Sequence, residues 1–216
     1  MGYKAVIFDL DGTLLDTLED IANSMNDVLT RLGFPAHDVK KYKYFVGDGM
    51  RMLVERALPQ DKRSIEIIEN TLSEYREEYS GRWAEKAMPY DGIQQLLDEL
   101  VAKNIKIAVL SNKPHSITVP AVESLLSKWS FEVIYGERPG HPRKPDPSSA
   151  LEISEHLGIS PKEILYVGDT SIDMKTANAA GMYAVGVLWG FRDADELSEN
   201  GAKTLIAHPM ELVELL

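Results

Sequence analysis

Two aspartates two positions apart, Asp9 and Asp11, directly follow the apolar run at residues 5–8. In an extended segment, residues i and i+2 point to the same side, so both carboxylates can converge at a strand end. Open α/β folds bind their ligands at such strand ends. One carboxylate can attack an electrophile while its neighbour transfers a proton, and both can help to hold a divalent cation. The alternative is a turn that happens to contain two aspartates, since Asp is common in turns.

Polar residues also follow two later apolar runs. Ser111 and Asn112 come after the run at 105–110 and could bind the oxygens of a phosphoryl group, although both types also cap helices. Lys144 precedes Pro145, and proline restricts the residue before it to extended geometry. Such a lysine could project into the carboxylate cluster and stabilise phosphoryl charge, or it could be an ordinary surface lysine.

A second acidic pair, Asp169 and Asp173, follows the run at 164–167. Mg²⁺ prefers hard oxygen ligands and few protein carboxylates. The Asp9 side chain, the Asp11 carbonyl and Asp169 would meet that preference, and Asp173 could face the same point. Helix capping by Asp169 or Thr170, supported by Asp173 through the helix dipole, is the alternative, and it is compatible with metal binding.

The elements that must position these residues are short apolar strands. Strands are predicted at 5–9, 105–110, 131–135, 164–167 and 183–187, and they are apolar at nearly every position. Helical patterns at 93–103, 148–157 and 174–180 alternate with the last four. This alternation predicts an α/β fold with a doubly wound, Rossmann-like parallel sheet covered by helices on both faces. A short strand at 204–207 and a final helix from Pro209 complete the chain.

Residues 15–86 interrupt this alternation with helical patterns at 21–32, 50–58 and 65–79 and no convincing strand. We therefore predict two domains. Residues 1–14 and 87–216 form an α/β core, and residues 15–86 form an inserted helical cap that acts as a lid over the strand ends.

The composition restricts the function classes. The 216 residues carry a net charge of -11, which argues against nucleic acid and anionic membranes as partners. The chain has no cysteine, which suits a reducing cytoplasm. No apolar run approaches the ~20 residues that span a bilayer. We expect a cytoplasmic protein, and an acidic chain can still bind a small phosphorylated metabolite if the site itself carries a lysine and a metal ion.

Four segments together resemble one family over essentially the whole chain. The residues that carry the resemblance are Asp9-Leu10-Asp11-Gly12-Thr13-Leu14, Ser111-Asn112, Lys144-Pro145-Asp146-Pro147 and Gly168-Asp169-Thr170-Ser171-Ile172-Asp173. They are similar to the motifs of the haloacid dehalogenase-like (HAD) superfamily of phosphohydrolases. The resemblance implies a HAD core with an inserted helical cap.

The resemblance also implies a mechanism. Asp9 would attack phosphorus and become a transient phosphoaspartate, while Asp11 would protonate the leaving oxygen and later activate water. Ser111 and Lys144 would hold the phosphoryl oxygens. Mg²⁺ would lie between Asp9, the Asp11 carbonyl and Asp169, with Asp173 steadying the metal or Lys144. Thr13 and Asn112 are expected to contact the substrate.

The substrate should be selected by the cap, because the core recognises only phosphate and metal. Gly47 can offer a backbone N–H and Arg51 a guanidinium to an anionic group, unless the segment is an ordinary turn with a solvated arginine. This segment and residues 189–191 resemble phosphoglycolate phosphatases, although residues 135–140 depart from the expected pattern. We expect a Mg²⁺-dependent phosphatase acting on a small phosphate monoester, phosphoglycolate first.

Other functions stay open at this point. Relatives with a similar cap include a β-phosphoglucomutase-like phosphomutase, pyrophosphatases and sugar-phosphate phosphatases. A non-enzymatic module that uses Asp9 as a phospho-acceptor is the alternative from another class, and Asp11 as a second acid speaks against it. The sequence is compatible with either a monomer or a homodimer.

Overall fold

A computed structural model describes residues 2–216, and the chain divides into two compact units. We call them the core unit, formed by the residues up to Asp16 together with Pro89–Leu216, and the helical unit, Thr17–Met88. Each unit has its own set of buried apolar side chains. The carboxylates and lysines that gather at the candidate active site all belong to the core unit.

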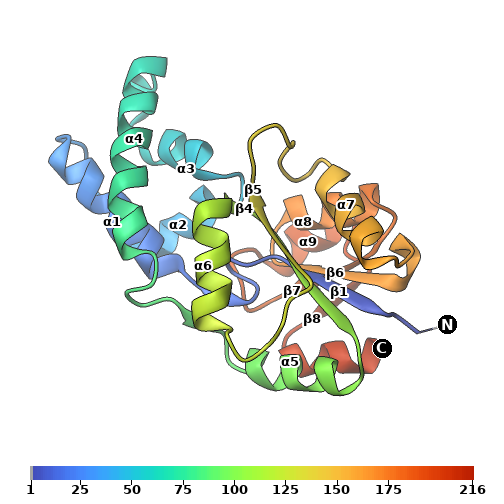
Figure 1. Ribbon diagram of the computed structural model, residues 1–216. Helices are drawn as coiled ribbons and strands as arrows, with labels where there is room; N and C mark the ends of the chain where they lie inside the picture. Colours follow the sequence, from blue (N-terminus) through green and yellow to red (C-terminus); the bar gives the residue numbers. More distant parts are fainter. Residues whose placement is uncertain (1) are drawn as a thin grey trace. The chain divides into compact units, whose positions relative to one another are not determined.

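The core unit contains a six-stranded sheet in the order β5-β4-β1-β6-β7-β8 (Figure 1). All neighbouring strands are parallel, so their carboxyl ends lie along one edge. The fold class predicted from the sequence is confirmed. The strands are β1 (Ala5–Phe8), β4 (Lys106–Pro114), β5 (Val133–Glu137), β6 (Ile164–Gly168), β7 (Tyr183–Val187) and β8 (Thr204–Ile206).

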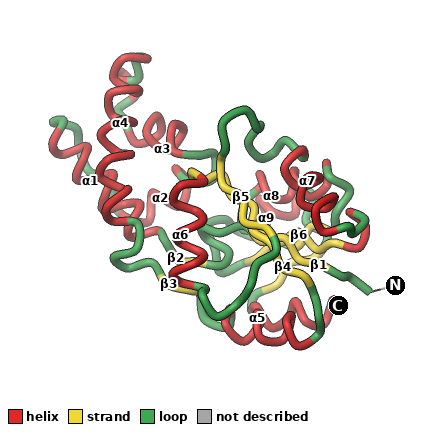
Figure 2. The backbone as a smooth tube through the Cα atoms, in the orientation of Figure 1, coloured by secondary structure: helices red, strands yellow, loops and turns green. Residues whose placement is uncertain are grey.

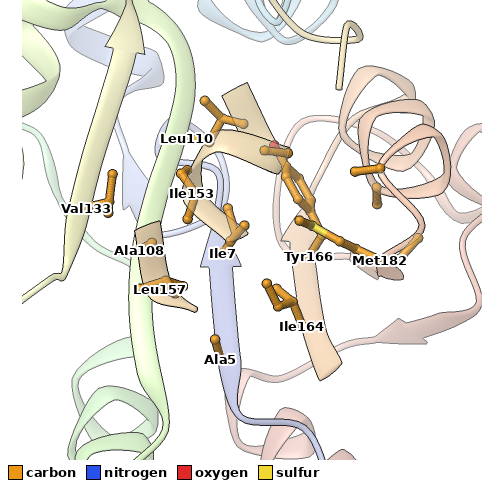
Figure 3. Packing of buried hydrophobic residues seen from close by; sticks show 14 of the residues in the cluster. Ala5, Ile7, Ala108, Leu110, Val133, Ile153, Leu157, Ile164, Tyr166 and Met182 are labelled. Carbon is orange, nitrogen blue, oxygen red and sulfur yellow. The ribbon is translucent and has the colours of Figure 1, made fainter. Parts of the chain in front are cut away.

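One face of this sheet packs against the helices that follow β5, β6 and β7. Ala5 and Ile7 lie on that face because alternate residues of a strand point to the same side, and they join Ile153 in one buried cluster (Figure 3). Apolar residues of all three helices contribute to the cluster. These helices are α7 (Ser148–Leu157), α8 (Ser171–Ala179) and α9 (Ala194–Glu199).

The remaining helices of the core unit also pack beside the sheet. Helix α5 (Ile93–Ala102) contacts β4, and α6 (His115–Leu125) contacts β4 and β5. Because Val6 and Phe8 are also fully buried, the sheet is covered on both faces. Two short 3-10 segments, η3 (Pro161–Glu163) and η4 (Pro209–Leu215), complete this unit.

Several elements differ from the sequence-based prediction. Helices α6 and α9 were not predicted, and β4 continues to Pro114 instead of ending at Leu110. The predicted final helix from Pro209 is a 3-10 helix. Residues 15 and 16 were assigned to a segment without strands, but they form β2 (Leu15–Asp16), which pairs with β3 (Met88–Pro89).

The helical unit has only helices as regular structure from Leu18 to Arg82 (Figure 2). Helices α1 and α4 pack along each other. The buried Asp20 carboxylate accepts hydrogen bonds from the backbone N–H groups of Lys86 and Ala87 at 2.9 to 3.0 Å, which ties α1 to the end of the unit. The elements are α1 (Leu18–Arg31), η1 (Val39–Lys41), α2 (Tyr42–Phe45), α3 (Met50–Ala57), η2 (Gln60–Lys62) and α4 (Ile65–Arg82).

Across residues 2–216, the helices are all too short or too polar for a bilayer span.

Candidate active site

The chemically useful side chains of the core unit gather at the carboxyl ends of β1, β4 and β6. Asp9 directly follows β1, Ser111 and Asn112 lie within the last part of β4, and Asp169 directly follows β6. Strand β1 lies between β4 and β6 in the sheet. The parallel arrangement therefore brings to one place residues that are up to 160 positions apart, as between Asp9 and Asp169.

Lys144 is the central cation of this site. Its ammonium lies 2.9 Å from Asp9 Oδ1 and 2.7 Å from Asp173 Oδ1, and its side chain is only 2% exposed. Asp9 Oδ1 also accepts a hydrogen bond from the Leu10 N–H at 2.7 Å. Among the described residues, 2–216, Lys144 and the Leu10 N–H both contact the Asp9 carboxylate through Oδ1. Its Oδ2 can therefore take another partner.

Asn112 holds the backbone of Lys144. The Lys144 N–H donates to Asn112 Oδ1 at 3.0 Å, and Asn112 Nδ2 donates to the Lys144 carbonyl at 3.1 Å. The Lys144–Pro145 peptide bond is cis. Ser111 Oγ accepts from the Lys113 N–H at 3.2 Å. The amide of Asn112, which we expected to contact substrate, therefore positions a lysine in this structure.

Asp169 is completely buried and has a partner on each oxygen. Thr13 Oγ1 donates to Oδ1 at 3.0 Å, and the Phe191 N–H donates to Oδ2 at 2.9 Å. Glycines surround it: a Cβ on Gly12 would lie 2.3 Å from Asp169 Oδ2, and a Cβ on Gly190 would lie 2.3 Å from Asp169 Cβ. The loops that contain Gly12 and Gly190 can approach this carboxylate only because they lack side chains there.

Asp173 lies in the first turn of α8, where it contacts both the helix cap and Lys144. Its Oδ2 accepts hydrogen bonds from the N–H and the hydroxyl of Thr170 at 3.1 and 2.7 Å. The first of these is one half of a capping box, in which the Asp173 N–H also pairs with the Thr170 side chain. Its Oδ1 contacts Lys144. Thr170, and not Asp169, is therefore the N-cap of α8, and Asp173 both supports this cap and makes the expected contact with Lys144.

Asp9, Asp169 and Asp173 form a group that could hold a cation. Each offers a carboxylate oxygen, the three oxygens lie within 4.8 Å of one another, and all three residues are buried. Among the ion pairs of residues 2–216, Lys144 is the only cation that contacts this group. Three buried carboxylates with one lysine leave excess negative charge, and hard oxygen ligands of this kind suit Mg²⁺.

The pKa values of Asp9 and Asp169 are raised first by burial and then by the neighbouring carboxylates. Burial, together with the charge of Asp173, raises the pKa of Asp9 to about 7, although Lys144 opposes this shift. Burial and the charges of Asp173 and Asp9 raise the pKa of Asp169 well above its usual range. A bound divalent cation would favour the ionised forms of both carboxyl groups.

Lys144 and Tyr166, which both interact with the carboxylates, also have shifted pKa values. Burial alone would lower the pKa of Lys144, but Asp173 and Asp9 outweigh it and raise the pKa well above the ordinary value. Burial raises the pKa of Tyr166 well above its ordinary value, so this phenol stays neutral. The Tyr166 hydroxyl lies near Lys144 without a well-aligned hydrogen bond among residues 2–216.

Asp11 has a lysine partner that was not predicted as a site residue. Lys113 Nζ lies 2.9 Å from Asp11 Oδ1 and 3.2 Å from Oδ2. The prediction placed Lys113 after a strand that ends at Leu110 and gave its side chain no role. The structure also adds Tyr166 and the Phe191 N–H, and no sequence signal identified either contact.

The two expected substrate contacts of the helical unit lie around the start of α3. Gly47 and Gly49 have φ angles of 114° and 86°, which favour glycine. Arg51 contacts Glu55 at 3.4 Å and Glu69 at 3.1 Å. Its guanidinium is therefore engaged within the helical unit in this structure, and a role in substrate binding stays a prediction.

Comparisons with known proteins agree with this geometry. The family model described as "Haloacid dehalogenase-like hydrolase" matches residues 6–187. Phosphoglycolate phosphatase of Chromobacterium violaceum is 35% identical, with 99% of this chain and 96% of that protein covered. The Aquifex aeolicus phosphoglycolate phosphatase is 31% identical, with 99% and 96% covered. The crystal structure of a proposed phosphoglycolate phosphatase from Lactobacillus delbrueckii subsp. bulgaricus has a TM-score of 0.93 and 31% identity, with 99% and 98% covered.

Proposed function

Because the chain belongs to the haloacid dehalogenase-like hydrolase family, we propose that it is a Mg²⁺-dependent phosphatase that hydrolyses a small phosphate monoester. Phosphoglycolate is the first candidate substrate, since relatives at 35% and 31% identity carry that name. The observation that carries the proposal is the buried Asp9 carboxylate, which is held by Lys144 beside Asp169 and Asp173.

The first chemical step belongs to Asp9. Its Oδ2 attacks phosphorus, the bond between phosphorus and the ester oxygen breaks, and an aspartyl phosphate forms. Asp11 gives its proton to the departing oxygen, so that the alcohol leaves neutral. In the second step Asp11 takes a proton from water, the water oxygen attacks phosphorus, and Asp9 leaves as a carboxylate with inorganic phosphate as the product.

The remaining residues position and neutralise the phosphoryl group. Lys144 balances the charge on Asp9 and on the transferring group, and Ser111 offers a hydroxyl. Asn112 determines where Lys144 lies by holding its backbone. Thr13 supports the same site through Asp169.

A divalent cation fits the buried carboxylates. Asp9 and Asp169 would hold it with the Asp11 carbonyl, while Asp173 steadies Lys144. When bound, it would neutralise phosphoryl charge as a Lewis acid. The burial of Asp9 and Asp169 beside Asp173 supports this assignment, because a bound cation would favour the ionised forms of carboxyl groups whose pKa values burial and neighbouring charge raise.

The helical unit, through Gly47 and Arg51, is proposed to select the substrate as a cap. Arg51 would have to leave Glu55 and Glu69 to bind an anionic group. A reducing cytoplasm remains the proposed location, with a small phosphorylated metabolite as the partner.

Phosphate release from a panel of small phosphate esters, with and without Mg²⁺, tests this proposal. The panel should include phosphoglycolate, a sugar phosphate and pyrophosphate. We expect Mg²⁺-dependent, stoichiometric release of phosphate, with phosphoglycolate the best substrate. Transfer of the phosphoryl group to a second position of the sugar without free phosphate would instead indicate a phosphomutase. A long-lived aspartyl phosphate without turnover would indicate a phospho-acceptor module.

A further inference from the structure

The loop that carries Lys144 joins β5 to α7 and spans residues 138–147 (Figure 1). Lys144 is its only buried residue, and most of the others are exposed. The loop begins within the segment at 135–140, whose departure from the expected pattern the steps described above leave without a role. The central cation of the site therefore depends for its position on whatever contacts fix a mostly exposed loop.

Arg138 makes the strongest of these contacts. Its Nη1 donates to Glu152 Oε1 at 3.1 Å and its Nη2 donates to Glu152 Oε2 at 2.7 Å, which is a bidentate pair. Its guanidinium carbon lies 3.5 Å from the centre of the Tyr135 ring, a distance typical of a cation–π stack. The Arg138 side chain is only 17% exposed. We call Tyr135, Arg138 and Glu152 the arginine clamp.

The arginine clamp joins the two ends of the loop. Arg138 is the first residue after β5, and Glu152 lies in α7, which follows the last residue of the loop. An exposed loop can adopt many conformations, and contacts that hold its ends together reduce their number. Because both Nη groups are engaged, the planar guanidinium also has a fixed orientation. The clamp therefore limits the paths that the loop can follow between β5 and α7.

Two further contacts act on the middle of the loop. Asn112 holds the backbone of Lys144. Arg143 Nη2 lies 2.6 Å from Glu137 Oε1, which ties the residue before Lys144 to the last residue of β5. Both contacts require the loop to follow one path, and that path places the Lys144 ammonium 2.9 Å from Asp9 Oδ1.

We propose that Arg138 is a positioning residue that acts on catalysis through Lys144. This inference rests on the proposed phosphatase function and adds to it a residue that orders the loop of the central lysine. Without the arginine clamp, the loop adopts other paths, in which the ammonium leaves Asp9. Only molecules with Lys144 in place transfer the phosphoryl group, so kcat falls. Substrate still binds through Ser111 and the proposed cap, so KM changes less.

Steady-state kinetics of Arg138→Met with phosphoglycolate is the first test. We expect kcat to fall about 10- to 30-fold, while KM changes less than about 3-fold. Arg138→Lys keeps the charge but lacks the planar fork, so it should recover part of the loss and reach within about 5-fold of wild type. Arg31→Met is the matched control and should keep wild-type kcat, because Arg31 forms a similar pair with Glu74 inside the helical unit.

A double-mutant cycle with Lys144→Met separates positioning from a general structural role. In the Lys144→Met protein, Arg138→Met should lower kcat by less than about 2-fold, because the group that it positions is already gone. An equal fold loss of kcat with and without Lys144 would overturn the inference, and so would a wild-type kcat in folded Arg138→Met.

Hydrogen exchange gives a readout that needs no activity. The Lys144 N–H donates to Asn112 Oδ1, so its exchange rate, measured by NMR, reports whether the loop keeps its path. We expect this amide to exchange more than about 10-fold faster in Arg138→Met, while the amides of β1 keep their wild-type rates. An unchanged rate at Lys144 overturns the inference. Equal acceleration at β1 overturns it as well, since it indicates general destabilisation.

Glu152→Gln breaks the same clamp from α7 and keeps the inference testable if Arg138→Met fails to fold. Glutamine keeps a hydrogen bond but removes the charge, so we expect the same pattern at a smaller size, with kcat about 3- to 10-fold lower. Wild-type kcat together with wild-type exchange at Lys144 would overturn the inference. Absence of phosphate release by the wild-type protein refutes the proposed function instead, and the exchange of the Lys144 amide still decides the role of Arg138.

Discussion

Each of the two carboxylates at the end of β1 contacts its own buried lysine. Asp9 contacts Lys144, and Asp11 contacts Lys113. Lys144 also contacts Asp173, so it belongs to the acidic group that suits a cation. Because each aspartate has its own lysine, Asp9 and Asp11 have different surroundings although they are only two residues apart. Different surroundings are what allow one carboxylate to act as a nucleophile and the other to transfer protons.

Replacement of the proposed nucleophile should abolish turnover. We expect Asp9→Asn to lower kcat by about four orders of magnitude or more, since an amide oxygen is a poor nucleophile. The fold should persist, because asparagine has the same shape and Lys144 keeps its contact with Asp173. Phosphate release and a melting curve check both points. Activity above about 1% of wild type would contradict the nucleophilic role.

At the scale of elements, the apolar strands could be predicted because parallel strands covered on both faces are apolar at nearly every position. Helix α6 was missed because Pro120 lies inside it, and α9 because it is short and polar. The end of β4 was missed for a different reason. Residues 111–113 are polar yet buried, since they line the site, and a hydrophobic pattern does not reveal such a strand.

The candidate site, too, could be predicted only in part from the sequence. Strand-end spacing was sufficient to expect Asp9, Lys144 and Asp169 near one another, and the structure brings Lys144 to Asp9 at 2.9 Å. The contacts of Asn112 with Lys144 and of Asp11 with Lys113 depend on side-chain geometry across different strands. Such contacts have no local sequence signal, because the residues involved are 32 and 102 positions apart.

The loop after β7 is required to leave room for Asp169. We expect Gly190→Ala to weaken Mg²⁺ binding more than 10-fold and to destabilise the fold by about 1 to 3 kcal/mol through overpacking. The added Cβ would lie 2.3 Å from Asp169 Cβ and 2.5 Å from the Gly12 carbonyl. Calorimetry and urea unfolding measure the two effects. Gly81→Ala in α4 is the control, since a Cβ there meets nothing within 4 Å and should slightly stabilise the helix. Wild-type affinity in Gly190→Ala would contradict the role of this loop.

The helical unit contains a buried hydroxyl that costs stability. Thr71 in α4 is fully buried, and its Oγ1 has no hydrogen-bond partner among residues 2–216. Thr71→Val replaces the hydroxyl by a methyl group of similar size, so we expect the free energy of unfolding to rise by about 1 kcal/mol. Urea unfolding tests this expectation. A loss of more than about 1 kcal/mol would mean that the hydroxyl makes a stabilising contact.

At the scale of the whole molecule, the acidic site links stability to pH and metal. The folded-state pKa of Asp9, about 7, lies above the ordinary 3.8. Between these values the folded protein binds a proton that the unfolded chain does not, so this contribution to stability is lost as pH rises through about 7. Mg²⁺ binds the ionised form of Asp9. The stabilisation by bound Mg²⁺ should therefore grow as pH rises over this range.

Thermal melting with and without Mg²⁺ at about pH 5.5 and about pH 8.5 measures this linkage. We expect the Mg²⁺-induced rise in Tm to be larger at the higher pH in wild type. The pH dependence should be weaker in Asp9→Asn, which cannot titrate at this position. A Mg²⁺ effect that does not change between the two pH values in wild type would show that Asp9 does not compete for protons with the metal.

The most direct test of the account is to find the residue that carries the phosphoryl group. The protein is mixed with phosphoglycolate and Mg²⁺, quenched within one turnover and treated with borohydride, which reduces an acyl phosphate to an alcohol. Mass spectrometry of the peptide that contains residues 5–16 should then show homoserine at position 9, with Asp11 unchanged. Homoserine at Asp11 or Asp169, or no modified residue despite phosphate release, would contradict Asp9 as the nucleophile.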